Sequence, residues 1–179
     1  MKKVIVLFLV VLCTFSAFAA KQAVSVKCAP IVTQISTSSE EPDYTVDSKY
    51  GIGAEASYRY YLVKGLYADG GLSWNTYLLP EGRPALTSLM AFGGVGYDCR
   101  LSKEFSIGGH AEIGADTLLY DKTGSETITL KTGIECIYHF ENEMAITFGC
   151  DGTFGFAKKA GTNYVNYRIL PAVGMSVDL

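Results

Sequence analysis

Polar and apolar residues alternate along most of the chain. In residues 127–140, for example, Thr, Lys, Gly and Glu mostly alternate with Ile, Leu, Cys and Tyr. The same period of two recurs in residues 51–60, 144–156 and 165–179. Because successive side chains of a β-strand point to opposite faces, this period predicts strands with one polar and one apolar face.

Seven turn signals separate the alternating segments at intervals of about twenty residues. They fall near residues 42–43, 63–65, 80–82, 100–103, 121–124, 141–143 and 158–161. Seven turns define eight strands, long enough for the 9–11 residues that a tilted strand needs to cross a bilayer. We therefore predict an all-β fold, an eight-stranded antiparallel up-and-down transmembrane β-barrel with both chain ends on one side.

The N-terminal residues have the pattern of a cleavable signal peptide. Lys2 and Lys3 precede an apolar stretch at residues 4–12, and Ala17 and Ala19 occupy the −3 and −1 positions of a cleavage site. The apolar stretch is too short to cross a bilayer as a helix. We predict a signal peptide at residues 1–19, a barrel domain at residues 20–179, and export to the bacterial outer membrane.

The composition of the two rows indicates which one faces inward. The polar rows are rich in Gly, Ser and Thr, which suit a narrow interior, and charged residues make up only 18% of the chain. Aromatic residues gather near the row ends, as in the interfacial girdles of transmembrane barrels. These are Tyr60, Trp74, Tyr97, Phe105, Tyr138, Phe140, Phe154, Phe156 and Tyr167. A soluble lipocalin-like carrier, with the two rows reversed, is the alternative.

A polar row that faces inward carries many charges into the lumen. The predicted lumen network consists of Lys27, Glu55, Arg59, Asp69, Asp98, His110, Glu112, Asp116, Lys131, Glu135, Asp151 and Arg168. The turn positions predict Arg59 opposite Asp69 or one pair away, and Lys131 close to Asp151. Eight strands enclose a space that side chains can fill, so these charges are expected to form a self-neutralising plug. A narrow, gated, ion-conducting pore is the alternative.

Other chemistry has little support in the sequence. The formal net charge of −3 gives no basic stripe for a nucleic acid. Ser106, His110 and Glu112 share one row, but His110 falls near mid-height, away from any lipid acyl chain, so we predict no enzyme activity. No metal or cofactor is predicted, because the cysteines lack metal-site spacing and are interpreted mainly as small apolar residues, with disulfides left open. They are Cys28, Cys99, Cys136 and Cys150.

Taken together, the signal peptide, eight strands, inward charges and aromatic girdles resemble a known family. This family consists of the small eight-stranded outer-membrane β-barrels of the opacity-protein and outer-membrane-protein-A transmembrane-domain type. The resemblance implies contact with outer-membrane lipid and delivery by periplasmic chaperones to the outer-membrane assembly machinery. One departure is the C-terminus, which ends in Leu179 where such barrels usually end in an aromatic residue.

The predicted external loops differ in charge. Residues 39–44 are acidic and residues 157–161 are basic. Exposed loops on a rigid scaffold commonly carry binding specificity. The sequence therefore favours a structural or surface-interaction role, adhesin-like, with a host or surface ligand at the loops. A narrow porin-like channel is the alternative, and a soluble periplasmic carrier is the third possibility.

Overall fold

The computed structural model describes residues 21–40, 43–78, 86–120, 123–159 and 162–179. The predicted signal peptide at residues 1–19 lies outside this part of the chain. The side chains of the two charged loops, residues 39–44 and 157–161, also lie outside the described residues.

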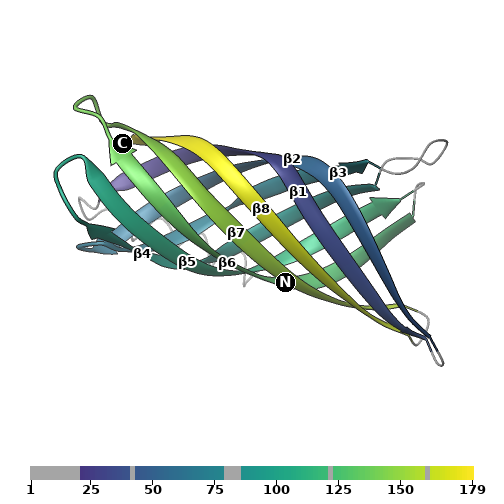
Figure 1. Cartoon of the computed structure of the whole chain (residues 1–179). Coiled ribbons are helices and arrows are strands. Elements are labelled where there is room, and N and C mark those ends of the chain that lie inside the picture. Colours follow the sequence, from purple (N-terminus) through teal and green to yellow (C-terminus); the bar gives the residue numbers. More distant parts are fainter. Residues whose placement is uncertain (1–20, 41–42, 79–85, 121–122, 160–161) are drawn as a thin grey trace.

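Eight antiparallel strands form a closed barrel in which each strand pairs with its neighbours in sequence and β1 pairs with β8 (Figure 1). The predicted fold class is confirmed, and all seven predicted turns overlap the breaks between strands. The strands are β1 (Gln22–Glu40), β2 (Asp43–Val63), β3 (Leu66–Leu78), β4 (Leu86–Arg100), β5 (Phe105–Tyr120), β6 (Thr123–His139), β7 (Met144–Lys159) and β8 (Thr162–Asp178).

One end of the barrel, here called the short-turn end, carries the connections at residues 64–65, 101–104 and 140–143. Gly65 has a φ of 81°, a left-handed conformation that glycine adopts without steric cost. The two ends of the described chain also meet here, since Lys21 Nζ lies 2.5 Å from Asp178 Oδ2. The opposite end, here called the hairpin end, carries the other four connections.

The strands are longer than a bilayer requires. β2 contains 21 residues and β1 contains 19, whereas about 9–11 residues of a tilted strand cross a bilayer. The β1–β2 ladder continues to the pair of Glu40 and Asp43. This hairpin therefore extends as paired strands beyond the thickness of a membrane at the hairpin end.

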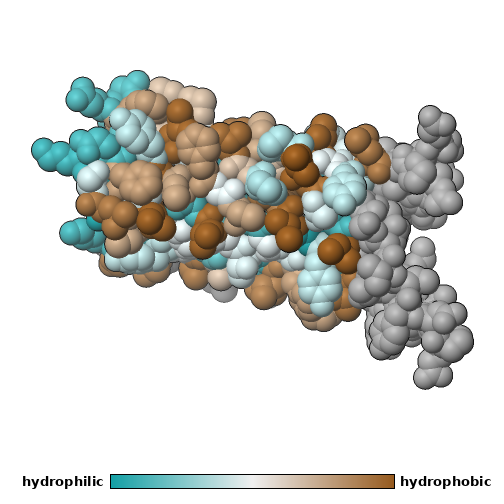
Figure 2. Space-filling view, in the orientation of Figure 1, coloured by the Kyte–Doolittle hydropathy of each residue, from teal (hydrophilic) through white to brown (hydrophobic). Residues whose placement is uncertain are grey.

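The two rows of side chains face as the sequence predicts. Large apolar side chains lie on the outside, with Ile134, Leu72 and Ile128 exposed by 69%, 67% and 67%. Figure 2 shows apolar residues distributed over the barrel wall and hydrophilic residues gathered at the short-turn end. Buried polar residues occupy the interior. This distribution is that of a transmembrane barrel, because a soluble carrier would need the apolar row inside and the polar row outside.

Within the described ranges, no helix is long and apolar enough to cross a membrane.

The nine aromatic residues of the predicted girdles belong to the outward-facing rows. Tyr138 and Phe140 stack edge to face near the short-turn end, with ring centroids 5.2 Å apart. In the half nearer the hairpin end, the ring centroid of Phe154 lies 4.3 Å from that of Phe156 and 4.7 Å from that of Tyr167. These pairs place aromatic surface at two heights on the outside of the barrel.

Candidate functional site

All twelve residues of the predicted lumen network lie on the inward rows of the barrel, and all eight strands contribute at least one. Most are almost fully buried, with exposed fractions of 1% for Asp116 and 2% for Lys131 and Glu135. A buried charge is costly unless it is paired. The contacts of these side chains form three clusters along the barrel axis.

The central cluster surrounds Lys131 on β6. Its Nζ lies 2.7 Å from Glu55 Oε2 on β2, 3.0 Å from Glu112 Oε2 on β5 and 3.5 Å from Asp151 Oδ2 on β7. His110 Nε2 lies 3.3 Å from Asp151 Oδ1 and 4.0 Å from Glu112 Oε1. One ammonium group is thus shared by three carboxylates from three different strands.

A second cluster, nearer the short-turn end, surrounds Glu135 on β6. Lys27 Nζ lies 3.1 Å from Glu135 Oε2, and Arg59 Nη1 lies 2.5 Å from Glu135 Oε1. Arg59 and Asp69 lie directly opposite each other in the β2–β3 ladder, and Arg59 Nε donates to Asp69 Oδ2 at 3.2 Å. Lys27 is also 3.9 Å from Glu55, which links this cluster to the central one.

The third cluster, nearer the hairpin end, surrounds Arg168 on β8. Its guanidinium donates to Ser88 Oγ at 3.0 Å, to Gln34 Oε1 at 3.2 Å and to Asp116 Oδ2. Ser88 Oγ in turn donates to Asp116 Oδ1 at 2.7 Å. All three guanidinium nitrogens therefore donate to partners, which lie on three strands.

Several of these contacts join strands on opposite sides of the barrel. In an eight-stranded ring, β2 faces β6 and β4 faces β8. Lys131–Glu55 and Glu135–Arg59 join β6 to β2, and Arg168–Ser88 joins β8 to β4. Side chains that meet across the full diameter fill the lumen at three heights, as the narrow interior of an eight-stranded barrel allows.

Three inward aromatic residues, missed by the sequence reasoning, pack against the cations. Lys131 Nζ lies 4.0 Å from the Phe92 ring centroid, and Arg59 Cζ lies 4.7 Å from that of Tyr67. Arg168 Cζ lies 5.9 Å from the ring of Tyr77. Such cation–π contacts strengthen when both partners are shielded from water. The signal was present in the sequence, because Tyr67 and Tyr77 share the row of Asp69.

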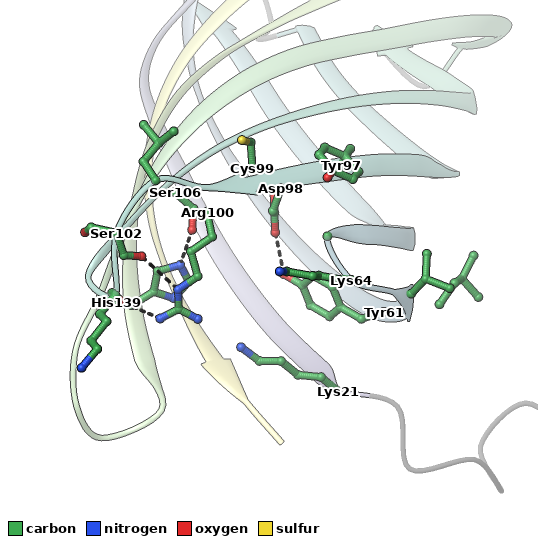
Figure 3. A pocket seen from close by; sticks show the side chains of 15 residues that line it. Lys21, Tyr61, Lys64, Tyr97, Asp98, Cys99, Arg100, Ser102, Ser106 and His139 are labelled. Carbon is green, nitrogen blue, oxygen red and sulfur yellow. Dashed lines mark hydrogen bonds between the residues drawn. The ribbon is translucent and has the colours of Figure 1, made fainter.

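The lumen widens into an open mouth at the short-turn end. A cavity of about 1040 Å³ is lined by residues of the β2–β3 and β4–β5 turns together with Lys21, Ser106 and His139. The hydrogen bonds drawn in Figure 3 include one that Tyr61 Oη donates to Asp98 Oδ2 at 2.7 Å and one between Ser106 Oγ and His139 Nε2 at 2.9 Å. The mouth is thus bordered by both polar and apolar side chains.

The row shared by Ser106, His110 and Glu112 does not produce one site. Ser106 hydrogen-bonds to His139 at the mouth, while His110 contacts Asp151 in the central cluster. Across the described part of the chain, no three His, Cys, Asp or Glu side chains are grouped so that they could hold a metal ion.

Solved structures of other proteins share this fold. The fold aligns with Neisserial surface protein A with a TM-score of 0.60 and 12% identity, covering 88% of this chain and 97% of that one. It also aligns with the outer membrane protein OprG from Pseudomonas aeruginosa, with a TM-score of 0.51 and 10% identity over 90% and 96% of the two chains. The chain has the fold of a small outer-membrane β-barrel.

The likeness to these small outer-membrane barrels is one of fold, since the identities are low. No model of a known protein family matches the sequence, and no curated protein sequence matches it. The role of this barrel therefore has to be argued from its own residues.

Proposed function

We propose that this chain is an integral outer-membrane barrel with a closed lumen, which acts as a structural or surface-interaction protein without enzyme activity. The observation that carries the proposal is the set of ion pairs that cross the lumen diameter at Lys131–Glu55 and Arg59–Glu135. A conducting pore needs a continuous aqueous path, and side chains that meet across the barrel occupy it.

Outer-membrane location is supported by three independent features. The outward apolar row requires lipid, the fold is that of small outer-membrane barrels, and the predicted signal peptide supplies export. Outer-membrane lipid, periplasmic chaperones and the outer-membrane assembly machinery are the partners that such a barrel needs. In this location the short-turn end faces the periplasm and the hairpin end faces outward.

The hairpin end offers a rigid platform for surface interaction. The β1–β2 ladder remains paired up to Glu40 and Asp43, and β8 lies beside β1, with Ser38 paired to Tyr164. The acidic residues 39–44 and the basic residues 157–161 therefore belong to hairpins that are neighbours around the ring. We propose that these neighbouring hairpins bind a host or surface ligand that carries both charge signs.

Loop exchange tests the surface role. Residues 39–44 and 157–161 are replaced together by Gly/Ser sequences of equal length, and adherence of expressing cells to matrix-coated surfaces is measured. Heat-dependent mobility on SDS gels serves as the control for a folded barrel. We expect a folded barrel with lost adherence, whereas unchanged adherence of a folded variant contradicts the surface role.

A narrow cation-conducting channel is the second candidate. Among the described residues the lumen network has seven carboxylates and four basic side chains, and the mouth cavity already opens at one end. If the central cluster opened, an acidic pathway would favour cations. Replacing Lys131 by Ala should then alter a measurable conductance, and a wild-type protein and a variant that both remain silent exclude the channel.

A further inference from the structure

The rim of the barrel has a step at the short-turn end, where β3 is shorter than its neighbour β4. β3 begins at Leu66, which pairs with Tyr97, whereas β4 continues past Tyr97 to Arg100 and into the β4–β5 turn. Asp98 N donates to Gly65 O at 2.8 Å, so the β2–β3 turn lies beside Asp98 and β4 extends beyond it. Side chains of both the inward and the outward rows therefore line the mouth cavity at this step.

The outward side chains at the step are apolar or aromatic. Leu62 and Leu101 line the mouth cavity and are exposed by 44% and 59%. Tyr97 lines it as well and is exposed by 55%. Tyr97 belongs to the predicted aromatic girdle, and such girdles lie at the level of the lipid head groups. The outer side of the cavity is thus a surface that lipid covers.

The mouth cavity also carries an excess of positive charge. Its charged lining residues are four basic side chains and one acidic one: Lys21, Lys64, Arg100, Lys103 and Asp98. Figure 3 shows Lys21, Lys64 and Arg100 around the same opening. Lys21 is paired with Asp178, whereas none of the ion pairs among the described residues involves Lys64 or Lys103. These two ammonium groups are therefore available to an anion.

Hydrogen bonds within the β4–β5 turn hold its cations in place. Arg100 Nε donates to Ser102 O at 3.1 Å, and Arg100 Nη2 donates to Lys103 O. Ser102 Oγ accepts from Glu104 N at 3.2 Å and from Phe105 N at 3.1 Å. A turn that is already ordered in this way loses little conformational freedom when a ligand binds.

We infer that the mouth cavity binds an anionic phospholipid at the step, with its phosphate at Lys64, Arg100 and Lys103 and its acyl chains along Leu62 and Leu101. The ligand class follows from the two kinds of side chain, because cations attract a phosphate and the adjoining apolar wall suits acyl chains. A soluble anion would use the cations but leave the apolar wall unused. The inference goes beyond the proposed surface role and needs only the transmembrane fold.

The β6–β7 turn provides a matched contrast at the same end of the barrel. It carries Glu141 and Glu143, and neither glutamate lines the mouth cavity. Tyr138 and Phe140 lie beside this turn on the outward row and are exposed by 47% and 42%. Both regions present apolar or aromatic surface to lipid, but the charges beside them are opposite. A preference for head-group charge should therefore distinguish the two regions.

Photolabelling with two lipids tests the site. The full barrel is placed in phosphatidylcholine vesicles that contain a small fraction of either phosphatidylglycerol or phosphatidylcholine with a diazirine near the head-group end of one acyl chain. Adducts are mapped by mass spectrometry. We expect phosphatidylglycerol to label Leu62 and Leu101 about fivefold more than phosphatidylcholine does, and Tyr138 and Phe140 no more. Equal ratios at the two regions overturn the inference. Both leaflets contain the probe, so the orientation of the barrel does not affect the result.

Removing the unpaired lysines supplies the second test. Lys64→Gln combined with Lys103→Gln removes two charges from exposed turn residues. The excess labelling of Leu101 by phosphatidylglycerol should then fall to the level of phosphatidylcholine. Lys49→Gln, on β2 toward the hairpin end, is the control and should leave the excess unchanged. An unchanged excess in the double variant, with heat-dependent gel mobility showing a folded barrel, contradicts the site.

Competition distinguishes a phospholipid from a soluble anion. Labelling by phosphatidylglycerol is repeated with millimolar inorganic phosphate, and with chloride at the same ionic strength. A bound phospholipid also makes acyl-chain contacts, so we expect the excess at Leu101 to persist in phosphate. If phosphate removes the excess and chloride does not, the cavity takes a soluble phosphate and the lipid assignment is wrong.

Discussion

Ion pairs at two places in this barrel differ in how far their side chains are exposed to solvent. In the central cluster, Lys131 and Glu112 have side chains only 2% and 1% exposed, and the ammonium group has carboxylates on three sides. At the short-turn end, Lys21 and Asp178 also meet closely, but their side chains are 45% and 25% exposed. The first pair is shielded from solvent inside the lumen, whereas the second lies in solvent. The same chemistry is therefore expected to contribute more to stability in the first place than in the second.

The largest effect is expected at Lys131. Lys131→Met removes the ammonium group and leaves Glu55, Glu112 and Asp151 facing one another without their shared cation. Breaking a buried ion pair in this way costs about 3–5 kcal/mol. We expect the free energy of unfolding in urea, measured in lipid vesicles, to fall by that amount.

Lys64→Met is the matched control, because Lys64 is exposed in a short turn. It should change the free energy of unfolding by less than about 0.5 kcal/mol. Equal losses for the two variants would mean that the central cluster contributes no more than a surface charge does.

A smaller effect is expected where glycine makes room for the central cluster. A Cβ at Gly133 would lie 2.1 Å from Asp151 Oδ1 and 2.6 Å from the His110 ring, whereas one at Gly152 would meet nothing nearer than 3.9 Å. Gly133→Ala should therefore cost about 1–3 kcal/mol through overpacking. Gly152→Ala is the control, and urea unfolding should separate the two variants. If they behave alike, the cluster is loose enough to absorb an extra methyl group.

At the mouth, the Ser106–His139 hydrogen bond is expected to contribute less to the free energy of unfolding than the packing around Gly133. Ser106→Ala removes a 2.9 Å contact beside an open cavity, where water can replace the lost partner. A hydrogen bond of this kind contributes about 0.5–1.5 kcal/mol, measured here by urea unfolding. A loss as large as that of Lys131→Met would show that the mouth is as tightly coupled as the lumen.

The smallest effect is expected at the exposed pair. Lys21→Ala should change the free energy of unfolding by about 0–1 kcal/mol, because solvent screens the Lys21–Asp178 attraction. The difference from the unaltered protein should shrink further at 1 M salt. A loss that persists at high salt would show that this pair is shielded from solvent, as the buried pairs are.

The parts of this architecture that depend on local pattern could be predicted from sequence. Turn positions gave eight strands, and the two-residue period gave the inward and outward rows. Hairpin spacing placed Arg59 opposite Asp69, because a tight turn fixes the register of its two strands. Each of these features involves residues within one strand or one hairpin.

Features that depend on closure of the barrel could not be predicted in the same way. Lys131 and Glu55 are 76 residues apart and meet only because β6 and β2 face each other across the ring. The β-bulge in β1 shifts the register between β1 and β8 by one residue between Cys28 and Thr33. The alternation of polar and apolar residues in β8 does not predict this shift.

The central claim is that the lumen is closed, and the most direct measurement is ion flux through the unaltered protein. The purified barrel is inserted into planar bilayers and recorded at a range of voltages in KCl, with heat-dependent gel mobility confirming that it is folded. The closed lumen predicts no steady conductance above that of the lipid alone. A reproducible single-channel conductance from the folded protein would contradict it, because ions would then pass the Lys131, Glu135 and Arg168 clusters.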